Sequence, residues 1–389
     1  MRVPVDIKET AQRHLRSRIP PRPPAKAGSA LRFGVLGTSR VASRVLIDPA
    51  RLHAEVIVDA VAAEDHTRAT QFAREHGIAR VFGSYDELIN DPNVDAVYIG
   101  VASNKHLELA QKVLARRKHV LLGTPSVCTE AYAGHLFHSS SLLQANRPVL
   151  LEAIPYRFHP SWIAFQSHID RDNIKDVKVT VTMPVSPNTP RNLPFRAEQS
   201  GAAMMGPVYA LSILQGIFRC DASECEEWNH GVDEYSGRFK FELNNRRAAT
   251  GVVRGLKVKG GEKYTVVEVV VMHERIEETP QDPEERWKRY QTRTVRLHCS
   301  WGRPALIRIA VEDVHAMYDV ETEDADETLI GDMLAPYTLR DAGVDRDSKP
   351  YWKTPKYMLD EFVHRVKGRP GSGAWITAAD SMGLTRLIE

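Results

Sequence analysis

The stretch Leu31-Arg32-Phe33-Gly34-Val35-Leu36-Gly37-Thr38-Ser39-Arg40-Val41-Ala42 indicates the fold of the first part of the chain. Its first six residues are mostly apolar and predict a buried strand, which ends at Gly37. A helix is expected to begin at Val41, directly after the turn. The turn reads Gly-x-Ser-x-x-Ala, so a serine stands at its middle position. A strand, a tight turn and a helix in this order are typical of a phosphate-binding turn, although they also occur as a plain connection.

The alternation of strands and helices continues as far as residue 154. Strands are expected at 31–36, 55–63, 95–99, 119–122 and 148–152, and helices between them at 41–46, 67–76, 106–116 and 130–145. Strands that alternate with helices through short loops predict a parallel, doubly wound sheet. We therefore expect an α/β fold whose residues 31–154 form a Rossmann-type, dinucleotide-binding domain.

The end of the second strand bears on the choice of cofactor. Glu64 follows this strand, and an acidic group at that point accepts hydrogen bonds from the adenosine ribose, which favours NAD. Arg40 is the nearest candidate to meet the 2′-phosphate of NADP. Both cofactors stay open at this point. The residues expected to bind one are Gly37, Thr38, Ser39, Arg40, Val41 and Glu64.

The pattern changes after residue 155 and predicts a second, α+β domain over 155–389. An apolar helix is expected at 202–218, and a charged insertion at 273–293 is expected to form an exposed loop or a short helix. Mainly antiparallel strands of an open sheet are expected at 177–183, 238–241, 249–253, 264–272, 294–297 and 306–311. Helices at 356–367 and 377–388 are expected to close the chain against the first domain. Residues 1–30 are basic and proline-rich and predict an extended arm.

Composition excludes several classes of function. The 389 residues carry a formal net charge of only +2, which argues against a dedicated nucleic-acid or membrane-surface binder. No run approaches the ~20 apolar residues of a membrane span. The N-terminus has no apolar signal core, and the four cysteines match no zinc pattern. We therefore expect a cytoplasmic protein without a metal site.

Several further motifs carry a resemblance to a known family. They are Arg74-Glu75-His76-Gly77-Ile78, Gly83-Ser84-Tyr85-Asp86-Glu87-Leu88, Asp91-Pro92-Asn93-Val94-Asp95-Ala96, Leu151-Glu152-Ala153 and Tyr156-Arg157-Phe158-His159-Pro160. Together they resemble the glucose–fructose oxidoreductase / inositol dehydrogenase (Gfo/Idh/MocA) family, and most closely its branch of dimeric dihydrodiol dehydrogenases and fungal xylose dehydrogenases. The resemblance implies a homodimer that pairs through the open sheet. It also implies a small-molecule site between the domains, above the nicotinamide.

The sequence departs from the family at its chemical positions. The family's Glu-Lys-Pro motif, whose lysine holds the substrate hydroxyl, is replaced by Gly123-Thr124-Pro125. The aspartate that the family carries before a helix falls on Met205, whereas Tyr209 stands at the family's tyrosine position. In the loop after the third parallel strand, Ser103 replaces an asparagine and His106 keeps the family's histidine. These two residues are also expected near the cofactor.

The candidate residues follow from this resemblance. Catalytic candidates are Tyr209, Thr124, Lys105 and Tyr156, where Lys105 is the one candidate to replace the lost lysine and is otherwise a solvated surface charge. The substrate pocket is expected to include Arg157, His159, Met204 and Met205, although Tyr156, Arg157 and His159 would equally serve as a hydrogen-bonded structural corner.

Three functions remain open from the sequence. The first is an enzyme repurposed for a non-redox step on a fairly apolar small molecule, which the loss of the lysine and the aspartate favours. A cyclisation, an isomerisation, a dehydration or a pericyclic step would fit, in a setting such as fungal specialised metabolism. The second is an NAD(P)-dependent dehydrogenase or reductase of a diol, sugar or carbonyl compound that uses Tyr209. The third is a non-catalytic protein that senses a cofactor or ligand.

Overall fold

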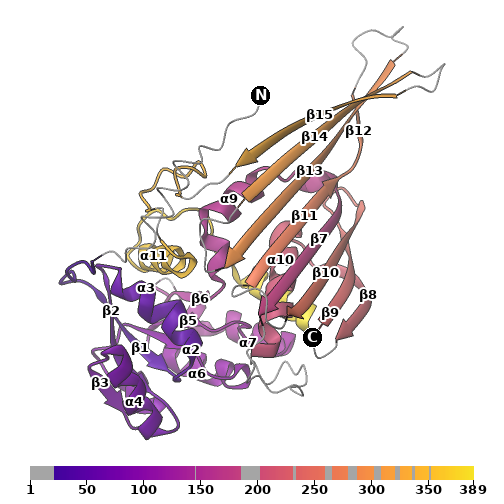
Figure 1. The fold of residues 1–389 in the computed structure, drawn as a ribbon. Helices are drawn as coiled ribbons and strands as arrows, with labels where there is room; N and C mark the ends of the chain where they lie inside the picture. The colour runs from indigo at the N-terminus through magenta and orange to yellow at the C-terminus, as the bar shows by residue number, and fades with distance from the viewer. Residues whose placement is uncertain are drawn as a thin grey trace. The chain divides into compact units, whose positions relative to one another are not determined.

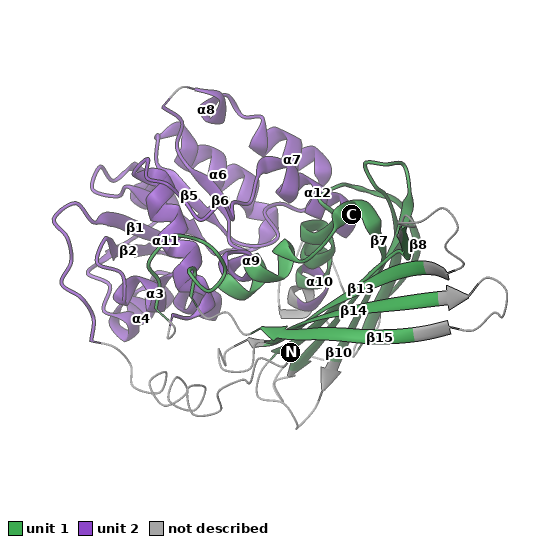
Figure 2. Cartoon of the chain, turned by 90° about the horizontal axis from the view of Figure 1, so that it is seen from above, with its two compact units in different colours: residues 1–17, 160–194, 209–350 green, residues 18–159, 195–208, 351–389 purple. Residues whose placement is uncertain are grey.

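The computed structural model describes ten segments of the chain (Figure 1). They are residues 22–144, 146–184, 202–230, 234–258, 265–278, 287–301, 308–319, 325–334, 338–349 and 352–389. Most of the basic arm predicted at 1–30 lies outside these residues. The chain divides into two compact units, coloured separately in Figure 2: residues 18–159, 195–208 and 351–389 form one, and residues 1–17, 160–194 and 209–350 form the other. We call them the parallel-sheet unit and the mixed-sheet unit.

The parallel-sheet unit holds a six-stranded sheet in the order β3-β2-β1-β4-β5-β6. Every pair of neighbouring strands runs parallel. The strands are β1 (Leu31–Leu36), β2 (Val56–Ala62), β3 (Arg80–Phe82), β4 (Ala96–Ile99), β5 (His119–Leu122) and β6 (Leu150–Glu152). The order reverses between β1 and β4, as in a doubly wound Rossmann sheet. Val35, Leu36, Val97 and Ile99 are fully buried, because helices cover both faces of such a sheet.

Helices are present where 41–46, 67–76 and 106–116 were predicted, whereas strand β3 and the helix that follows it were not predicted. The helices of this unit are α2 (Arg40–Ala42), the π-helical turn η1 (Ser43–Ile47), α3 (Asp48–Arg51), α4 (His66–His76), α5 (Tyr85–Asn90), η2 (Ser103–Lys105), α6 (His106–Ala115), α7 (Glu130–Phe137), α8 (Ser140–Leu143), η3 (Pro155–Phe158), α11 (Thr354–Val366) and α12 (Ala378–Ile388). The single helix expected at 130–145 is wrong. It is interrupted at Ser139, which is extended, and serines at 139–141 favour helix caps over helix interiors.

The mixed-sheet unit is built on a nine-stranded sheet. Eight strands follow the order β15-β14-β13-β11-β7-β10-β9-β8, and β12 pairs with β13. Only β7 and β10 run parallel; the other pairs are antiparallel. The elements are α9 (Pro160–Ser167), η4 (Arg171–Asn173), β7 (Ile174–Pro184), α10 (Ala202–Phe218), β8 (Ala222–His230), β9 (Glu234–Glu242), β10 (Ala248–Val258), β11 (Thr265–His273), β12 (Ile276–Glu278), β13 (Trp287–Trp301), β14 (Arg308–Asp319) and β15 (Ala325–Leu334).

One face of this sheet packs on helix α10. The rings of Phe218 and Phe241 stack at 3.9 Å, and a Cβ added at Gly251 would meet Leu214 at 3.1 Å. Val295 and Val311 are buried on the same face. Because side chains alternate along a strand, Leu329 and Met333 of β15 lie on the opposite face, and both are exposed.

Part of the sheet was not expected from the sequence. The insertion predicted as a loop or short helix at 273–293 contains β12 and the start of β13, while residues 279–286 lie outside the described part. Strands β8 and β15 were missed, because they form the two edges of the sheet and most of their side chains are exposed on both faces. Such strands lack the apolar alternation that identifies a half-buried strand.

Candidate dinucleotide site

The glycine turn after β1 lies where three strands end level. Leu36, the last residue of β1, pairs with Ala62 at the end of β2 and with Ile99 at the end of β4. Gly37 has φ +94°, a conformation that disfavours any side chain. A Cβ at this position would meet the carbonyl oxygen of Gly100 at 2.8 Å. The glycine is therefore required both by its backbone angle and by the close approach of the next loop.

Ser39 serves as the cap of the helix that follows this turn. Its side-chain oxygen accepts a hydrogen bond from the amide of Ala42 at 3.2 Å. The first amides of a helix have no partner within the helix, so those of Arg40 and Val41 are the donors nearest the turn. Both residues are exposed. The serine thus fixes the helix start without occupying these amide groups.

Glu64 and Lys105 face each other across this edge of the sheet. Glu64 follows β2, Lys105 ends η2 after β4, and the lysine amine forms an ion pair with the Glu64 carboxylate. The side chains are 65% and 44% exposed, respectively. The structure therefore supplies Lys105 with a carboxylate partner, and its role as a proton donor stays a prediction.

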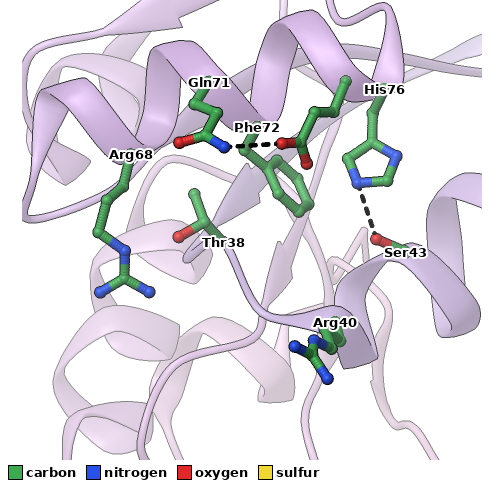
Figure 3. A pocket seen from close by; sticks show the side chains of 8 residues that line it. Thr38, Arg40, Ser43, Arg68, Gln71, Phe72 and His76 are labelled. Carbon is green, nitrogen blue, oxygen red and sulfur yellow. Dashed lines mark hydrogen bonds between the residues drawn. The ribbon is translucent and has the colours of Figure 1, made fainter.

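A hollow of about 250 Å³ lies beside the glycine turn, between the turn and helix α4 (Figure 3). Arg68 and Arg40 lie on either side of Thr38 in this view. Their guanidinium groups are exposed and form no ion pair with another described residue. Sequence reasoning missed Arg68, although a basic residue in the first turns of the helix after the second strand was the available signal. The lining residues are Thr38, Arg40, Ser43, Arg68, Gln71, Phe72, Glu75 and His76.

The loop that carries Thr124 is tied to the end of β6. The Thr124 hydroxyl donates to the main-chain oxygen of Ala153 at 2.8 Å, and the Thr124–Pro125 peptide bond is cis. The amide of Ser126 donates to the carboxylate of Glu152 at 2.9 Å. The threonine hydroxyl is therefore engaged by the main chain and brings no positive charge to the loop.

His106 connects the same loop to the loop after β4. Its Nδ1 lies 3.1 Å from the carbonyl oxygen of Pro125 and 3.0 Å from that of Ser126, and its Nε2 lies 3.0 Å from that of Val101. Burial lowers the pKa of this histidine and so favours its neutral ring, against the opposing influence of the carbonyl oxygens of Ser126, Val101 and Pro125. Ser103 is also buried, and the thiol of Cys128 donates to its hydroxyl at 3.3 Å. The histidine therefore contacts the backbone of both loops, and the Ser103 hydroxyl contacts the side chain of Cys128.

Glu152 is a buried acid that the sequence analysis quoted only within a family motif and did not name as a candidate site residue. Burial raises its pKa to about 7, against the opposing influence of Ser381, Ser126 and Arg157. Its Oε2 atom makes no hydrogen bond with a described residue. The signals in the sequence were its place at the end of an apolar strand and within the motif Leu151-Glu152-Ala153.

The Tyr156–His159 segment packs into the interior of the parallel-sheet unit. Tyr156 is 6% exposed, and Arg157 forms an ion pair with Asp380 of α12 at 3.1 Å. The ring of His159 stands edge-on to Tyr357 at 5.3 Å, and burial lowers the pKa of His159 to about 4. These contacts fit the structural-corner alternative for the three residues, and their role in a substrate pocket stays a prediction.

The remaining candidates lie on helix α10. Tyr209 is half-buried, and its main-chain oxygen accepts a hydrogen bond from the Ser212 hydroxyl at 2.8 Å. The side chains of Met204 and Met205 lie outside the described residues. Tyr209 belongs to the mixed-sheet unit and Thr124 to the parallel-sheet unit, so their pairing in one site stays a prediction.

Neither a metal site nor a membrane span was found in the part of the chain that the structure describes. No three His, Cys, Asp or Glu side chains gather there in a way that would hold a metal ion. Among the same residues, no helix combines the length and the apolar character that crossing a membrane requires.

Together, the doubly wound sheet, the glycine turn at its switch point and the acidic group beyond β2 define a Rossmann domain of the dinucleotide-binding class. Residues 31–152 match the sequence pattern of the family described as "Oxidoreductase family, NAD-binding Rossmann fold". Over this domain the chain is similar to the Gfo/Idh/MocA oxidoreductases, in agreement with the family resemblance and the fold class predicted from the sequence.

Curated relatives agree with this assignment. The chain is 30% identical over 194 residues to the trans-1,2-dihydrobenzene-1,2-diol dehydrogenase of Sus scrofa, a match that covers 49% of this chain and 56% of that protein. It is 33% identical over 153 residues to the Homo sapiens protein of the same name, covering 39% and 44%, respectively. The chain thus spans about half the length of the curated relatives it matches.

Solved structures share the fold over nearly the whole chain. GenD2 from gentamicin A biosynthesis, in complex with NAD, aligns with a TM-score of 0.61 and 17% identity over 95% of both chains. KijD10, a 3-ketoreductase from Actinomadura kijaniata in complex with TDP-benzene and NADP, aligns with a TM-score of 0.57 and 17% identity, covering 92% of this chain and 96% of that one. At this identity the likeness concerns the fold alone.

Proposed function

We propose that the protein is an NAD(P)-dependent dehydrogenase or reductase of a small diol, sugar or carbonyl compound. The observation that carries this proposal is the Gly37 turn at the level ends of β1, β2 and β4, within a domain that matches an NAD-binding oxidoreductase family. The dihydrodiol dehydrogenases among the relatives support a redox reaction, and nothing in the comparisons supports a non-redox step.

The residues at this edge fit a dinucleotide. The unpaired amides of Arg40 and Val41 would bind its pyrophosphate at a helix N-terminus. The absence of a side chain at Gly37 keeps the turn tight. A bound nicotinamide would accept or supply a hydride, while the loop held by Thr124 and His106 would line its surroundings.

Hydride transfer to or from an alcohol also moves the proton of its hydroxyl group. The 123–126 loop carries no lysine, so another group must take or give this proton. The Thr124 hydroxyl already donates to Ala153, and the Lys105 amine is paired with Glu64. We therefore keep Tyr209 as the proposed general acid and base. Such a group typically contributes ~10²–10⁴-fold to rate, so Tyr209→Phe should lower the turnover number by about 100-fold with little change in cofactor affinity. Tyr132→Phe on exposed α7 is the matched control.

The cofactor we favour is NADP(H). The guanidinium groups of Arg40 and Arg68 flank Thr38 in the hollow beside the turn and offer a 2′-phosphate two charged partners. Glu64, which alone would favour NAD, is paired with Lys105 before a cofactor binds, so its charge by itself does not decide between the two cofactors. We expect Arg68→Ala to raise the dissociation constant of NADPH about tenfold, the loss of roughly 1.4 kcal/mol, and to leave that of NADH nearly unchanged.

The first experiment is a titration of the purified protein with NADPH and NADH, followed by energy transfer from tryptophan. Arg74→Ala is the control for Arg68→Ala, because Arg74 is exposed on the same helix but does not line the hollow. Binding of NADPH together with a change in nicotinamide absorbance on diols, sugars or carbonyl compounds supports the proposal. The absence of binding by either cofactor at millimolar concentration would refute it.

A second candidate function is a non-redox step on a small molecule. The specific observation in its favour is that the 123–126 loop carries Thr124, already bonded to the main chain, where the family has its lysine. An enzyme that converts a substrate without consuming a bound nicotinamide would support this candidate. A stoichiometric change in nicotinamide absorbance would exclude it.

We further propose that the protein is a cytoplasmic homodimer. Exposed Leu329 and Met333 lie on the sheet face opposite to the one that packs on α10, and a second copy would cover them. All four cysteines are free, as is usual for a protein of a reducing compartment.

A further inference from the structure

The Glu64–Lys105 ion pair crosses the end of strand β1. Strand β1 lies between β2 and β4, and all three end at the same level. Glu64 stands two residues beyond β2, and Lys105 is six residues beyond β4. Neighbouring strands lie ~4.8 Å apart, so the strands that carry the two residues are about 10 Å apart. The two side chains close this gap above the Gly37 turn.

The pair also crosses the point where a dinucleotide would lie. In an open, doubly wound sheet, ligands bind in the crevice outside the carboxyl ends of the strands, where the strand order reverses. Here the order reverses between β1 and β4. A dinucleotide that extends from the β2 side to the β4 side must therefore pass the ion pair.

The pair is suited to exchange its partners. The Glu64 side chain is 65% exposed and that of Lys105 is 44% exposed, and ion pairs open to water contribute little to stability because water screens them. A pyrophosphate carries more negative charge than one carboxylate, and a lysine amine binds phosphate well as a point charge. Opening the pair therefore costs little, whereas the phosphates offer Lys105 a more strongly charged partner.

We propose that Lys105 is a cofactor-binding residue that leaves Glu64 and pairs with the phosphates when the dinucleotide binds. Glu64 then competes with the phosphates for Lys105, so replacing Glu64 frees the lysine before the cofactor binds. This inference rests on the proposed function, since it requires that the chain bind NAD(H) or NADP(H). It assigns Lys105 to cofactor affinity rather than to proton transfer.

The first test compares Lys105→Met with Lys112→Met. Lys112 has a similar exposure and also forms an ion pair, but that pair joins α6 to Asp86 of α5. Titration with NADPH and NADH at low salt should show that Lys105→Met raises both dissociation constants at least fivefold, while Lys112→Met changes them by less than twofold. The effect of Lys105→Met should shrink as salt is added, because the contact is ionic. Equal affinities for the two variants would overturn the inference.

The second test asks whether Glu64 acts through Lys105. Glu64→Gln should tighten the binding of NADPH about threefold in the wild-type background, and this gain should disappear when Lys105 is already Met. An equal gain in NADPH affinity in both backgrounds would show that Glu64 merely repels the charged cofactor. It would refute the exchange of partners by Lys105. If the wild type binds neither cofactor, the proposed function itself fails. If the wild type binds and Lys105→Met matches the control, only the exchange fails.

Discussion

The substitution Gly37→Ala tests whether the turn after β1 has the geometry described. Gly37 has φ +94°, and an added Cβ would lie 2.8 Å from the carbonyl oxygen of Gly100. Such backbone strain costs ~1–3 kcal/mol, and forcing extra atoms into a packed site costs ~1–3 kcal/mol more. We therefore expect the parallel-sheet unit to lose about 3 kcal/mol or more.

Gly77→Ala is the matched control for this prediction. Gly77 ends helix α4 with φ +70°, but nothing lies within 4 Å of an added Cβ. Only the left-handed backbone opposes alanine there, which costs about 1–2 kcal/mol. A difference of about 2 kcal/mol between the two variants corresponds to ~4–8 °C in Tm for a domain of this size. Thermal unfolding followed by circular dichroism measures this difference in Tm. Equal losses of stability for Gly37→Ala and Gly77→Ala would refute the close approach to Gly100.

Two further predictions concern the buried acid and the open sheet face. Burial raises the pKa of Glu152 from 4.5 to about 7, so the folded state holds this proton more tightly; the resulting stability is fully present below pH 4.5 and is lost as the pH rises through 7. Glu152→Gln should therefore reduce the fall in the free energy of unfolding between pH 5 and pH 8, measured by urea denaturation, by about 3 kcal/mol. An unchanged dependence on pH would contradict the buried position. Leu329→Glu should convert the proposed dimer to monomer in sedimentation velocity because it places a charge in the covered face, whereas Leu143→Glu on exposed α8 should not; a dimer that survives the first change does not pair through this face.

The parallel sheet could be predicted because its strands are buried on both faces. Runs such as Phe33–Leu36 and Ala96–Ile99 are buried throughout, so no charged residue interrupts them. The helix expected at 67–76 was also correctly predicted to end at His76. The edge strands β8 and β15 could not be predicted in this way, because solvent reaches both of their faces and charged residues interrupt the pattern.

The candidate site was less accessible to sequence reasoning, because its contacts join residues far apart in the chain. The residue type at Thr124 could be read directly, but its bond to the carbonyl oxygen of Ala153 depends on the pairing of β5 with β6. The partner of Lys105 is likewise set by the order of the strands rather than by spacing in the sequence. Arg68 gains its significance only beside Thr38 in the folded hollow.

The division of the chain has a consequence for how the protein is made. The parallel-sheet unit contains residues 18–159 and also residues 351–389, which a ribosome delivers only after the whole of the intervening sheet has been synthesised. Helix α12 from this late segment provides Asp380, the partner of Arg157, and Ser381, which lies beside Glu152. Until α12 emerges, Arg157 therefore lacks its ion-pair partner and Glu152 lacks the serine beside it, so this part of the unit is completed only at the end of translation.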